Sequence, residues 1–234
     1  MSIRLVTFDL DNTLWDVDSV IRSAEQAMRD WLREHVPEVV TLYESEGIAD
    51  IRQAVLHELP DLRHDVSRFR IEVTRRAIER TGVGAQSAAR LAQRAFDVFI
   101  EGRHQVRYFD DALDTLDILS RRYTLAALSN GNADIRRLNL DRYFSFSVSA
   151  ADAGRSKPAP DMFLRALERT KSTPELAVHV GDHLHDDIHG ASNVGMHTVW
   201  VNLADQPRDA DSATPSATVR RLRELPAVIE ALRS

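Results

Sequence analysis

The sequence predicts an α/β protein in which an all-helical module is inserted into a parallel-sheet core after the first strand. Short apolar runs alternate with helical patterns through much of the chain, which is typical of a parallel sheet covered by helices. Residues 17–104 differ, because their apolar positions recur at helical spacing and no convincing strand interrupts them. A crossover between parallel strands needs only about a dozen residues, so this stretch is a module rather than a connection.

Composition limits the class of protein. The 234 residues fit one large domain or a domain with an inserted module, and a hydrophobic content of 43% is ample for a core. A net charge of -6 disfavours a nucleic-acid surface, and the absence of cysteine excludes disulfides and thiolate chemistry. We find no signal-peptide pattern and no apolar run long enough to cross a bilayer, and therefore expect a cytoplasmic protein without nucleic-acid or membrane partners.

The predicted strands of the core are short runs of apolar and β-branched residues. In chain order they are residues 3–8, 123–129, 144–150, 176–180 and 197–202. After the inserted module the core resumes near Val106, and the spacing of apolar residues predicts a helix over 109–122 and a last one over 222–234. The polar tract 204–218, between the last strand and the last helix, is expected to be a surface loop.

The inserted module is predicted to consist of amphipathic helices. Four segments have apolar residues along one helical face, namely 20–32, 48–59, 66–78 and 87–100. The domain prediction is therefore a core made of residues 1–16 and 105–234, and a helical module made of residues 17–104.

Polar residues follow the ends of three predicted strands. Asp9 and Asp11 follow the first, Ser129 and Asn130 follow the second, and Asp182 follows the fourth. Ligands of open parallel sheets bind at the carboxyl ends of the strands, so we expect these residues along one edge. The turn after Ser129 can offer main-chain N–H groups to an anion such as phosphate. The two neighbouring carboxylates repel each other unless a cation or a reacting group lies between them.

Lys157 is a further candidate for this edge. Of the 30 basic residues only Lys157 and Lys171 are lysine, and Lys157 lies in the loop after the third predicted strand. Its ammonium group suits a phosphate. Carboxylate oxygens together with a substrate phosphate are ligands that Mg²⁺ prefers, so we expect Asp9 and Asp182 to bind Mg²⁺. Asp187 would contribute directly or through an intervening group.

These parts suit phosphoryl transfer to and from a carboxylate. With the charge of the phosphate neutralised by Mg²⁺ and Lys157, Asp9 can attack phosphorus and form an acyl phosphate. Asp11 would then protonate the leaving oxygen and later activate water. The sequence therefore predicts a phosphatase with Asp9 as nucleophile and Asp11 as acid and base.

The motifs follow one another in the order DLDNT at 9–13, LSNG at 128–131, RSKP at 155–158 and GDHLHDD at 181–187. In this order they resemble the four motifs of the haloacid dehalogenase-like hydrolase superfamily, and the resemblance covers the whole chain. It implies a Rossmann-like core, a helical cap that corresponds to the inserted module, Mg²⁺ and an aspartyl-phosphate intermediate. It also implies that Thr13 and Ser129 contact the phosphate and that Asp11 offers its main-chain carbonyl oxygen to the metal.

Three further stretches, HDVSRFR, SNGNA and GRSKPAPDMF, are similar to bacterial phosphatases of riboflavin biosynthesis. These act on flavin mononucleotide or 5-amino-6-(5-phosphoribitylamino)uracil, so the expected substrate is a small phosphorylated metabolite such as FMN or a sugar or ribityl phosphate. Arg68 and Arg70 in the cap are candidate substrate contacts, and the alternative for both is a solvated helix face. Trp15 either lines the pocket or packs at the hinge between core and cap.

Other functions stay open at this point. A 2-haloacid dehalogenase would leave Asp11, Asp182 and Asp187 unexplained, because attack on carbon needs neither a metal nor an acid. A phospho-acceptor of the response-regulator kind would not place its acceptor after the first strand, and the helical module would have no role. A phosphomutase would share the site with a phosphatase. His185 and His189 have the spacing of a zinc pair, but the surrounding acids and the absence of cysteine favour an oxygen-bound ion.

Overall fold

The computed structural model describes residues 2–45 and 47–232 and divides the chain into two compact units. The first unit combines Met1–Asp16 with Arg107–Ser234, and the second is Val17–Val106. The sequence places the return to the core at residue 105, whereas the structural division falls at 107. Residues 233 and 234, the end of the last predicted helix, lie outside the described residues.

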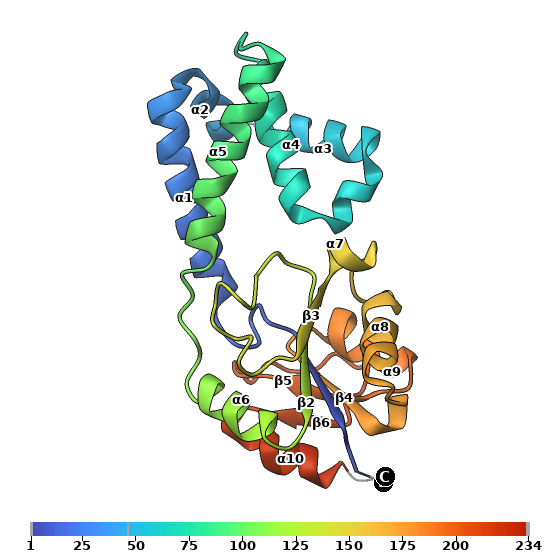
Figure 1. Ribbon diagram of the computed structural model, residues 1–234. Coiled ribbons are helices and arrows are strands. Elements are labelled where there is room, and N and C mark those ends of the chain that lie inside the picture. Colours follow the sequence, from blue (N-terminus) through green and yellow to red (C-terminus); the bar gives the residue numbers. More distant parts are fainter. Residues whose placement is uncertain (1, 46, 233–234) are drawn as a thin grey trace. The chain divides into compact units, whose positions relative to one another are not determined.

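Six strands of the described residues form one parallel sheet (Figure 1). They are β1 (Leu5–Phe8), β2 (Thr124–Ser129), β3 (Phe146–Ser149), β4 (Ala177–Gly181), β5 (His197–Val201) and β6 (Ala217–Val219). The strand order β3-β2-β1-β4-β5-β6 is that of doubly wound Rossmann-type sheets, and it reverses between β1 and β4. The predicted α/β fold with a Rossmann-like parallel core is confirmed.

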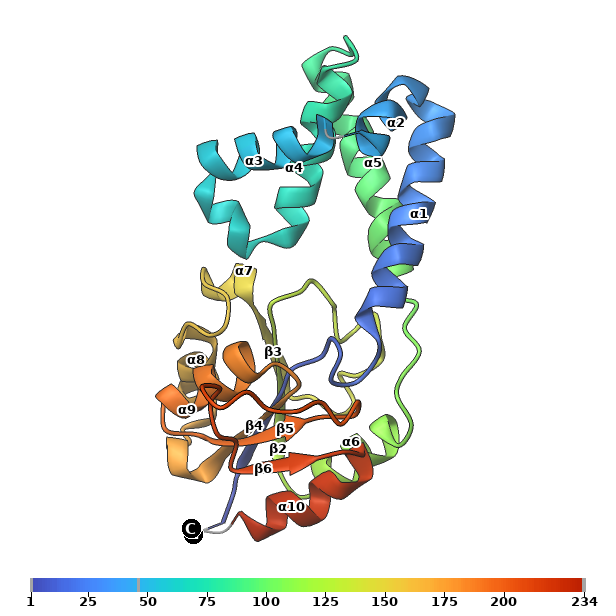
Figure 2. The same ribbon diagram turned by 180° about the vertical axis from the view of Figure 1, so that it is seen from behind.

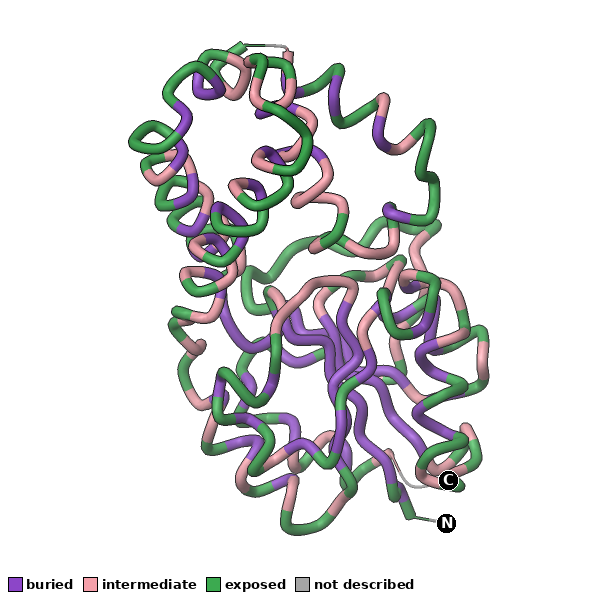
Figure 3. Tube along the Cα trace, turned by 45° about the horizontal axis from the view of Figure 1, so that its top comes forward, coloured by how far each residue is buried: buried purple, intermediate pink, exposed green. Residues whose placement is uncertain are grey.

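The central strands are buried on both faces, as Figure 3 shows for the sheet at the centre of this unit. Helices α6 and α10 cover one face and helices α8 and α9 cover the other (Figures 1 and 2). Strands enclosed in this way have uninterrupted apolar sequences, which is why they are recognisable from the sequence. The helices of this unit are α6 (Ala112–Ser120), α7 (Ala150–Ala153), α8 (Asp161–Thr170), α9 (Gly190–Asn193) and α10 (Leu225–Ala231). Further helical turns are η2 (Pro174–Leu176), η3 (Leu184–His189) and η4 (Leu222–Glu224).

Strand β6 corrects one sequence-based expectation. The tract 204–218 is expected to be a loop, but Ala217 and Thr218 at its end pair with β5. The strand has only three residues, of which Val219 alone is fully buried. So short an edge strand has no apolar alternation that would distinguish it from a loop.

The second unit is helical throughout its described residues apart from turns. Its elements are α1 (Val17–His35), α2 (Pro37–Glu44), α3 (Gly47–Glu58), η1 (Pro60–His64), α4 (Val66–Glu79) and α5 (Ala85–Arg103). Helix α5 packs against both α1 and α4, around buried side chains such as Met28, Val73 and Phe99. Helix α2 has no counterpart among the predicted segments, because it is only two turns long. No helix of the described residues is both long and apolar enough to pass through a membrane.

Candidate active site

The sheet brings polar residues together where the strand order reverses. Asp9 directly follows β1, Ser129 ends β2, and Asp182 directly follows β4. Since β2, β1 and β4 are neighbours, the carboxyl ends of all three strands lie side by side. One carboxylate oxygen from each of Asp9, Asp182 and Asp187 lies within 4.8 Å of the others.

Lys157 supplies a positive charge to these carboxylates. Its side chain is only 1% exposed, and Nζ donates to Asp9 Oδ1 at 2.6 Å and to Asp187 Oδ1 at 2.7 Å. A third bond, of 2.8 Å, goes to the main-chain oxygen of Leu128, so all three ammonium hydrogens have acceptors. Burial alone would lower the pKa of Lys157, but the charges of Asp187 and Asp9 outweigh it and raise the pKa, so the group stays charged.

Asp187 is held from three directions. Its Oδ1 accepts from Lys157 and lies 3.1 Å from His179 Nε2, and its Oδ2 accepts from the main-chain N–H of His183 at 3.0 Å. Gly181 makes room for this arrangement, because a Cβ atom at that position would lie 2.3 Å from the carboxyl carbon of Asp187. Any other residue at 181 would displace the carboxylate.

The three carboxylates outnumber the positive charge of Lys157, and their pKa values shift in different directions. Burial, followed by the charge of Asp187, raises the pKa of Asp182 to about 6. Burial also raises the pKa of Asp9 well above its usual value, although Lys157 opposes the shift. Burial alone would raise the pKa of Asp187, but Lys157 and His179 outweigh it and lower the pKa. The surplus of negative charge and the oxygen donors fit a hard divalent cation such as Mg²⁺.

The loop after β1 orients these carboxylates. The buried hydroxyl of Thr13 donates to Asp182 Oδ1 at 3.1 Å and lies 3.5 Å from Asp9 Oδ2. Trp15 Nε1 donates to Asp11 Oδ1 at 2.9 Å. The Trp15 side chain is fully buried and packs edge-on against Tyr108, so it packs inside the core unit rather than lining an open pocket.

Ser129 and Asn130, both expected at the phosphate, differ in what their side chains do. The Ser129 hydroxyl accepts the main-chain N–H of Gly131 at 2.9 Å, and a hydroxyl that accepts one bond still has its own hydrogen to donate. The Asn130 carboxamide instead holds the Lys157 main chain, accepting from its N–H at 2.8 Å and donating to its oxygen at 3.1 Å. The Asn130 side chain therefore positions the lysine loop, and only its main chain is left for an anion.

Sequence reasoning missed two residues of this site, Thr7 and His179. Both are fully buried, on β1 and β4, and Thr7 Oγ1 lies 2.7 Å from His179 Nδ1. Burial lowers the pKa of His179, against the opposing effect of Asp187. The available signal was a histidine inside the apolar run LAVHV, a polar residue where a central strand normally has none.

The cap candidates Arg68 and Arg70 both lie on α4 in the helical unit. Arg70 donates to Glu25 Oε1 at 2.9 Å, and its guanidinium carbon lies 3.8 Å from the centre of the Phe99 ring. It thereby links α4 to α1 and α5. Arg68 lies near the start of α4 and is exposed.

The histidines considered for zinc lie apart from the acidic cluster. His185 and His189 are exposed, and their rings stack with centroids 5.5 Å apart. Among the described residues, the aspartate cluster of Asp9, Asp182 and Asp187 is the one group of three or more side chains that could hold a metal ion.

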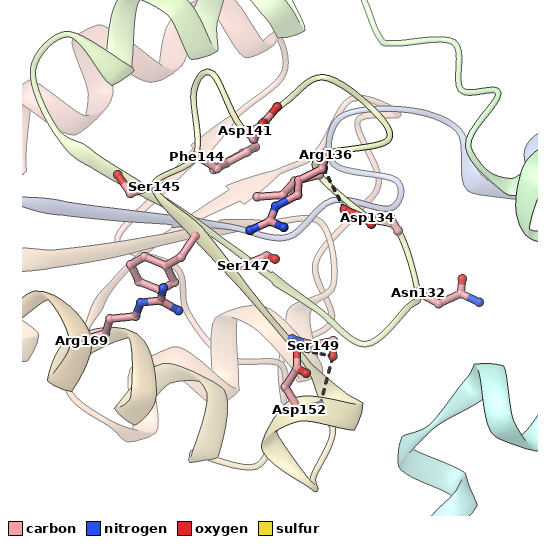
Figure 4. Close-up of a pocket in the computed structure, with 13 residues that line it drawn as sticks. Asn132, Asp134, Arg136, Asp141, Phe144, Ser145, Ser147, Ser149, Asp152 and Arg169 are labelled. Carbon is pink, nitrogen blue, oxygen red and sulfur yellow. Dashed lines mark hydrogen bonds between the residues drawn. The ribbon is translucent and has the colours of Figure 1, made fainter.

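A cavity of about 550 Å³ lies elsewhere on the core unit, beside the edge strand β3 (Figure 4). Several of its polar groups bond to one another. Asp134 accepts the main-chain N–H of Arg136, and Ser149 and Asp152 form a reciprocal cap at the start of α7. None of the clustered carboxylates lines this cavity, so it is separate from the candidate site.

Comparison with known proteins assigns the family. A family model of haloacid dehalogenase-like hydrolases matches residues 3–195. The chain belongs to this family of hydrolases. The resemblance inferred from the four sequence motifs is thereby confirmed.

Two curated relatives of this haloacid dehalogenase-like hydrolase are phosphatases. It is 33% identical to the 5-amino-6-(5-phospho-D-ribitylamino)uracil phosphatase of Escherichia coli, over 97% of this chain and 96% of the relative. It is 28% identical to the N-acylneuraminate-9-phosphatase of Mus musculus, over 98% of this chain and 95% of the relative. Both names refer to small phosphorylated substrates.

A solved structure points to a second reaction of the family. The crystal structure of a 2-haloacid dehalogenase from Pseudomonas syringae superimposes with a TM-score of 0.94 and shares 44% of its sequence, over 99% of this chain and 100% of that one. The choice between the two reactions depends on the residues of the site.

Proposed function

We propose that this haloacid dehalogenase-like hydrolase is a Mg²⁺-dependent phosphatase that hydrolyses a small phosphorylated metabolite through an aspartyl phosphate on Asp9. The observation that carries the proposal is the cluster of three carboxylates around a single buried ammonium group, that of Lys157. Asp9 and Asp182, with the main-chain oxygen of Asp11, would hold Mg²⁺. When bound, the ion would neutralise and polarise the phosphate.

Each half of the reaction uses Asp9 and Asp11. A carboxylate oxygen of Asp9 attacks phosphorus, the bond from phosphorus to the leaving oxygen breaks, and the carboxylic acid of Asp11 gives that oxygen its proton. Water then attacks phosphorus while the Asp11 carboxylate takes a proton from it, and the bond from phosphorus to Asp9 breaks. Phosphate leaves, and both residues return to their starting forms.

The remaining residues prepare this exchange. Lys157, bonded to Asp9, neutralises the nucleophile so that a negatively charged phosphate can approach it. The Ser129 hydroxyl and the main-chain N–H groups that follow would bind phosphate oxygens. We assign Asp187 mainly to orienting Lys157, because both of its oxygens accept protein hydrogen bonds. We assign Trp15 to orienting Asp11 rather than to contacting substrate.

A 2-haloacid dehalogenase is the second candidate, because the structural relative with 44% identity is described as one. In that reaction Asp9 would attack carbon, halide would leave, and water would attack the carbonyl carbon of the resulting ester. The reaction uses no acid at Asp11 and no cation between Asp9 and Asp182. The carboxyl group of Asp11 and the grouping of Asp182 with Asp9 would have no role in that reaction, and they therefore favour the phosphatase.

The destination of the water oxygen separates the two reactions. A single turnover in ¹⁸O-water, with enzyme in excess, should place the label in the released phosphate when a phosphate ester and Mg²⁺ are supplied, because water attacks phosphorus. A dehalogenase given 2-chloropropionate should place the label in the Asp9 carboxylate. Label in Asp9 together with released halide, and no phosphate release, would overturn the proposal.

The proposed substrate class is FMN or a ribityl phosphate, within the wider class of small phosphorylated metabolites. Support comes from the Escherichia coli relative, which matches this chain over almost its entire length and is named for a ribityl phosphate. A panel of phosphorylated metabolites, assayed for phosphate release with Mg²⁺ and with a chelator, tests both substrate and metal. Equal activity under both conditions would contradict the metal assignment.

A further inference from the structure

Thr7 and His179 occupy neighbouring positions on the central strands. They pair in register across β1 and β4, and residues two apart on a strand share a face. Thr7 therefore shares its face with Asp9, and His179 shares its face with Gly181, whose missing side chain makes room for Asp187. The Phe163 ring packs edge-on against His179 with centroids 5.0 Å apart and limits the ring's freedom.

The contacts of His179 define which nitrogen carries its hydrogen. A carboxylate only accepts, so the 3.1 Å contact to Asp187 Oδ1 requires a hydrogen on Nε2. In a neutral ring Nδ1 is then an acceptor, and the Thr7 hydroxyl donates to it at 2.7 Å. The other acceptor near that hydroxyl, the main-chain oxygen of Val178, lies 3.4 Å away. The single hydroxyl hydrogen therefore goes to His179.

We propose that His179, held as the Nε2–H tautomer by Thr7, is a positioning residue that fixes the Asp187 carboxylate and, through it, the Lys157 ammonium beside Asp9. A continuous series of hydrogen bonds runs from the Thr7 hydroxyl through the imidazole and Asp187 to Lys157. The kinetic part of this inference rests on the proposed phosphatase function, whereas the tautomer does not depend on it.

A neutral donor suits this position for an electrostatic reason. Lys157 is shared by Asp9 and Asp187, and the surplus negative charge of the cluster is what favours a divalent cation. A neutral imidazole orients Asp187 without cancelling that surplus. A permanent cation at 179 would compete with Lys157 for Asp187 Oδ1.

The tautomer can be measured directly on ¹⁵N-histidine-labelled protein, because the chemical shifts of protonated and unprotonated ring nitrogens differ. Nδ1 of the exposed His183 also accepts a hydrogen bond, from the main-chain N–H of Asp186, so the pattern alone does not identify His179. Among the nine histidines, we expect the His179 signal to show a protonated Nε2 and an unprotonated, hydrogen-bonded Nδ1. This signal should be absent from His179→Phe, and its Nδ1 shift should change in Thr7→Val. If His179→Phe does not fold, the nearly isosteric Thr7→Val assigns the signal. A doubly protonated ring or an Nδ1–H tautomer would overturn the inference.

Kinetics test the positioning role. Thr7→Val removes the hydroxyl and should lower kcat for para-nitrophenyl phosphate about fivefold, the typical worth of one hydrogen bond, with KM changed less than kcat. Thr7→Ser, which keeps the hydroxyl, should restore kcat. Thr198→Val is the matched control, because Thr198 is a buried threonine in register with His179 on β5, and its hydroxyl accepts from Ser216 instead. We expect unchanged kcat in this control.

The two proposals fail in different ways. Equal kcat losses in Thr7→Val and Thr198→Val, or no loss in either, would show that Thr7 contributes only to packing and would overturn the positioning role. If wild-type protein hydrolyses no phosphate ester, the proposed function fails. In that case the nitrogen spectra still decide whether Thr7 sets the tautomer of His179.

Discussion

Replacing Lys157 with methionine tests the electrostatic basis of the site. The substitution keeps the length of the side chain and removes the buried charge that bonds to Asp9 at 2.6 Å and to Asp187 at 2.7 Å. Removing one partner of a buried ion pair leaves an uncompensated charge and typically costs about 3–5 kcal/mol of folding free energy. For a chain of this size, this corresponds to a fall in melting temperature of roughly 6–20 °C.

Urea unfolding in the presence of a chelator at pH 7.5 measures this loss. The matched control is Lys171→Met, since Lys171 is the only other lysine and is exposed after α8, and we expect its effect to stay within about 0.5 kcal/mol. The double variant Lys157→Met with Asp187→Asn should recover about 1–3 kcal/mol of the loss, because the second change removes one of the unpaired carboxylates. A Lys157→Met protein as stable as the control would refute the assignment of Lys157 as the compensating charge.

Four further expectations follow from the same geometry. Asp9→Asn should abolish turnover without unfolding the protein, because an amide is not a nucleophile; appreciable activity in the folded variant would contradict this. The pKa of Asp182 is raised from 3.8 to about 6, so the folded state binds this proton more tightly than the unfolded state. Without metal, the free energy of unfolding should therefore fall by up to about 3 kcal/mol as the pH rises from roughly 4 to 6. Mg²⁺ should accordingly stabilise the protein more at pH 7.5 than at pH 5. Stabilisation by Mg²⁺ that does not change with pH would contradict the raised pKa of Asp182. Trp15→Phe should slow the hydrolysis of an alkyl phosphate more than that of para-nitrophenyl phosphate, because the alkyl leaving group needs the Asp11 proton. Equal slowing of both hydrolyses would indicate that Trp15 contributes only to packing. Arg68→Ala should raise KM for FMN and leave the turnover of para-nitrophenyl phosphate unchanged. An equal loss of activity for both esters, or a loss for neither, would assign Arg68 to a solvated helix face.

The core strands and the clustered aspartates could be predicted because their signals are local. An apolar run ending in acidic residues identifies a buried strand and its carboxyl end, and the parallel topology then brings Asp9 and Asp182 together. Strand β6 and helix α2 were missed because short elements have too few residues to show a period.

The roles of individual side chains depend on contacts between distant residues, which the sequence does not display. Asn130 follows a strand end and is therefore a natural phosphate ligand, yet its carboxamide bonds to the main chain of Lys157, 27 residues away. His179 reads as one residue of an apolar strand, and only the packing of β1, β4 and Asp187 gives it two partners. Trp15 is an aromatic residue beside the catalytic loop, and its burial directs its N–H to Asp11.

Covalent phosphorylation of Asp9 is the central claim, and rapid acid quenching of a single turnover measures it most directly. Enzyme in excess is mixed with Mg²⁺ and a ³²P-labelled phosphate ester, quenched within the first turnover and digested for peptide analysis. We expect label on the peptide that contains Asp9, its loss on treatment with hydroxylamine as for an acyl phosphate, and no label in Asp9→Asn. Phosphate release without labelled protein, or label on a residue other than Asp9, would contradict the account.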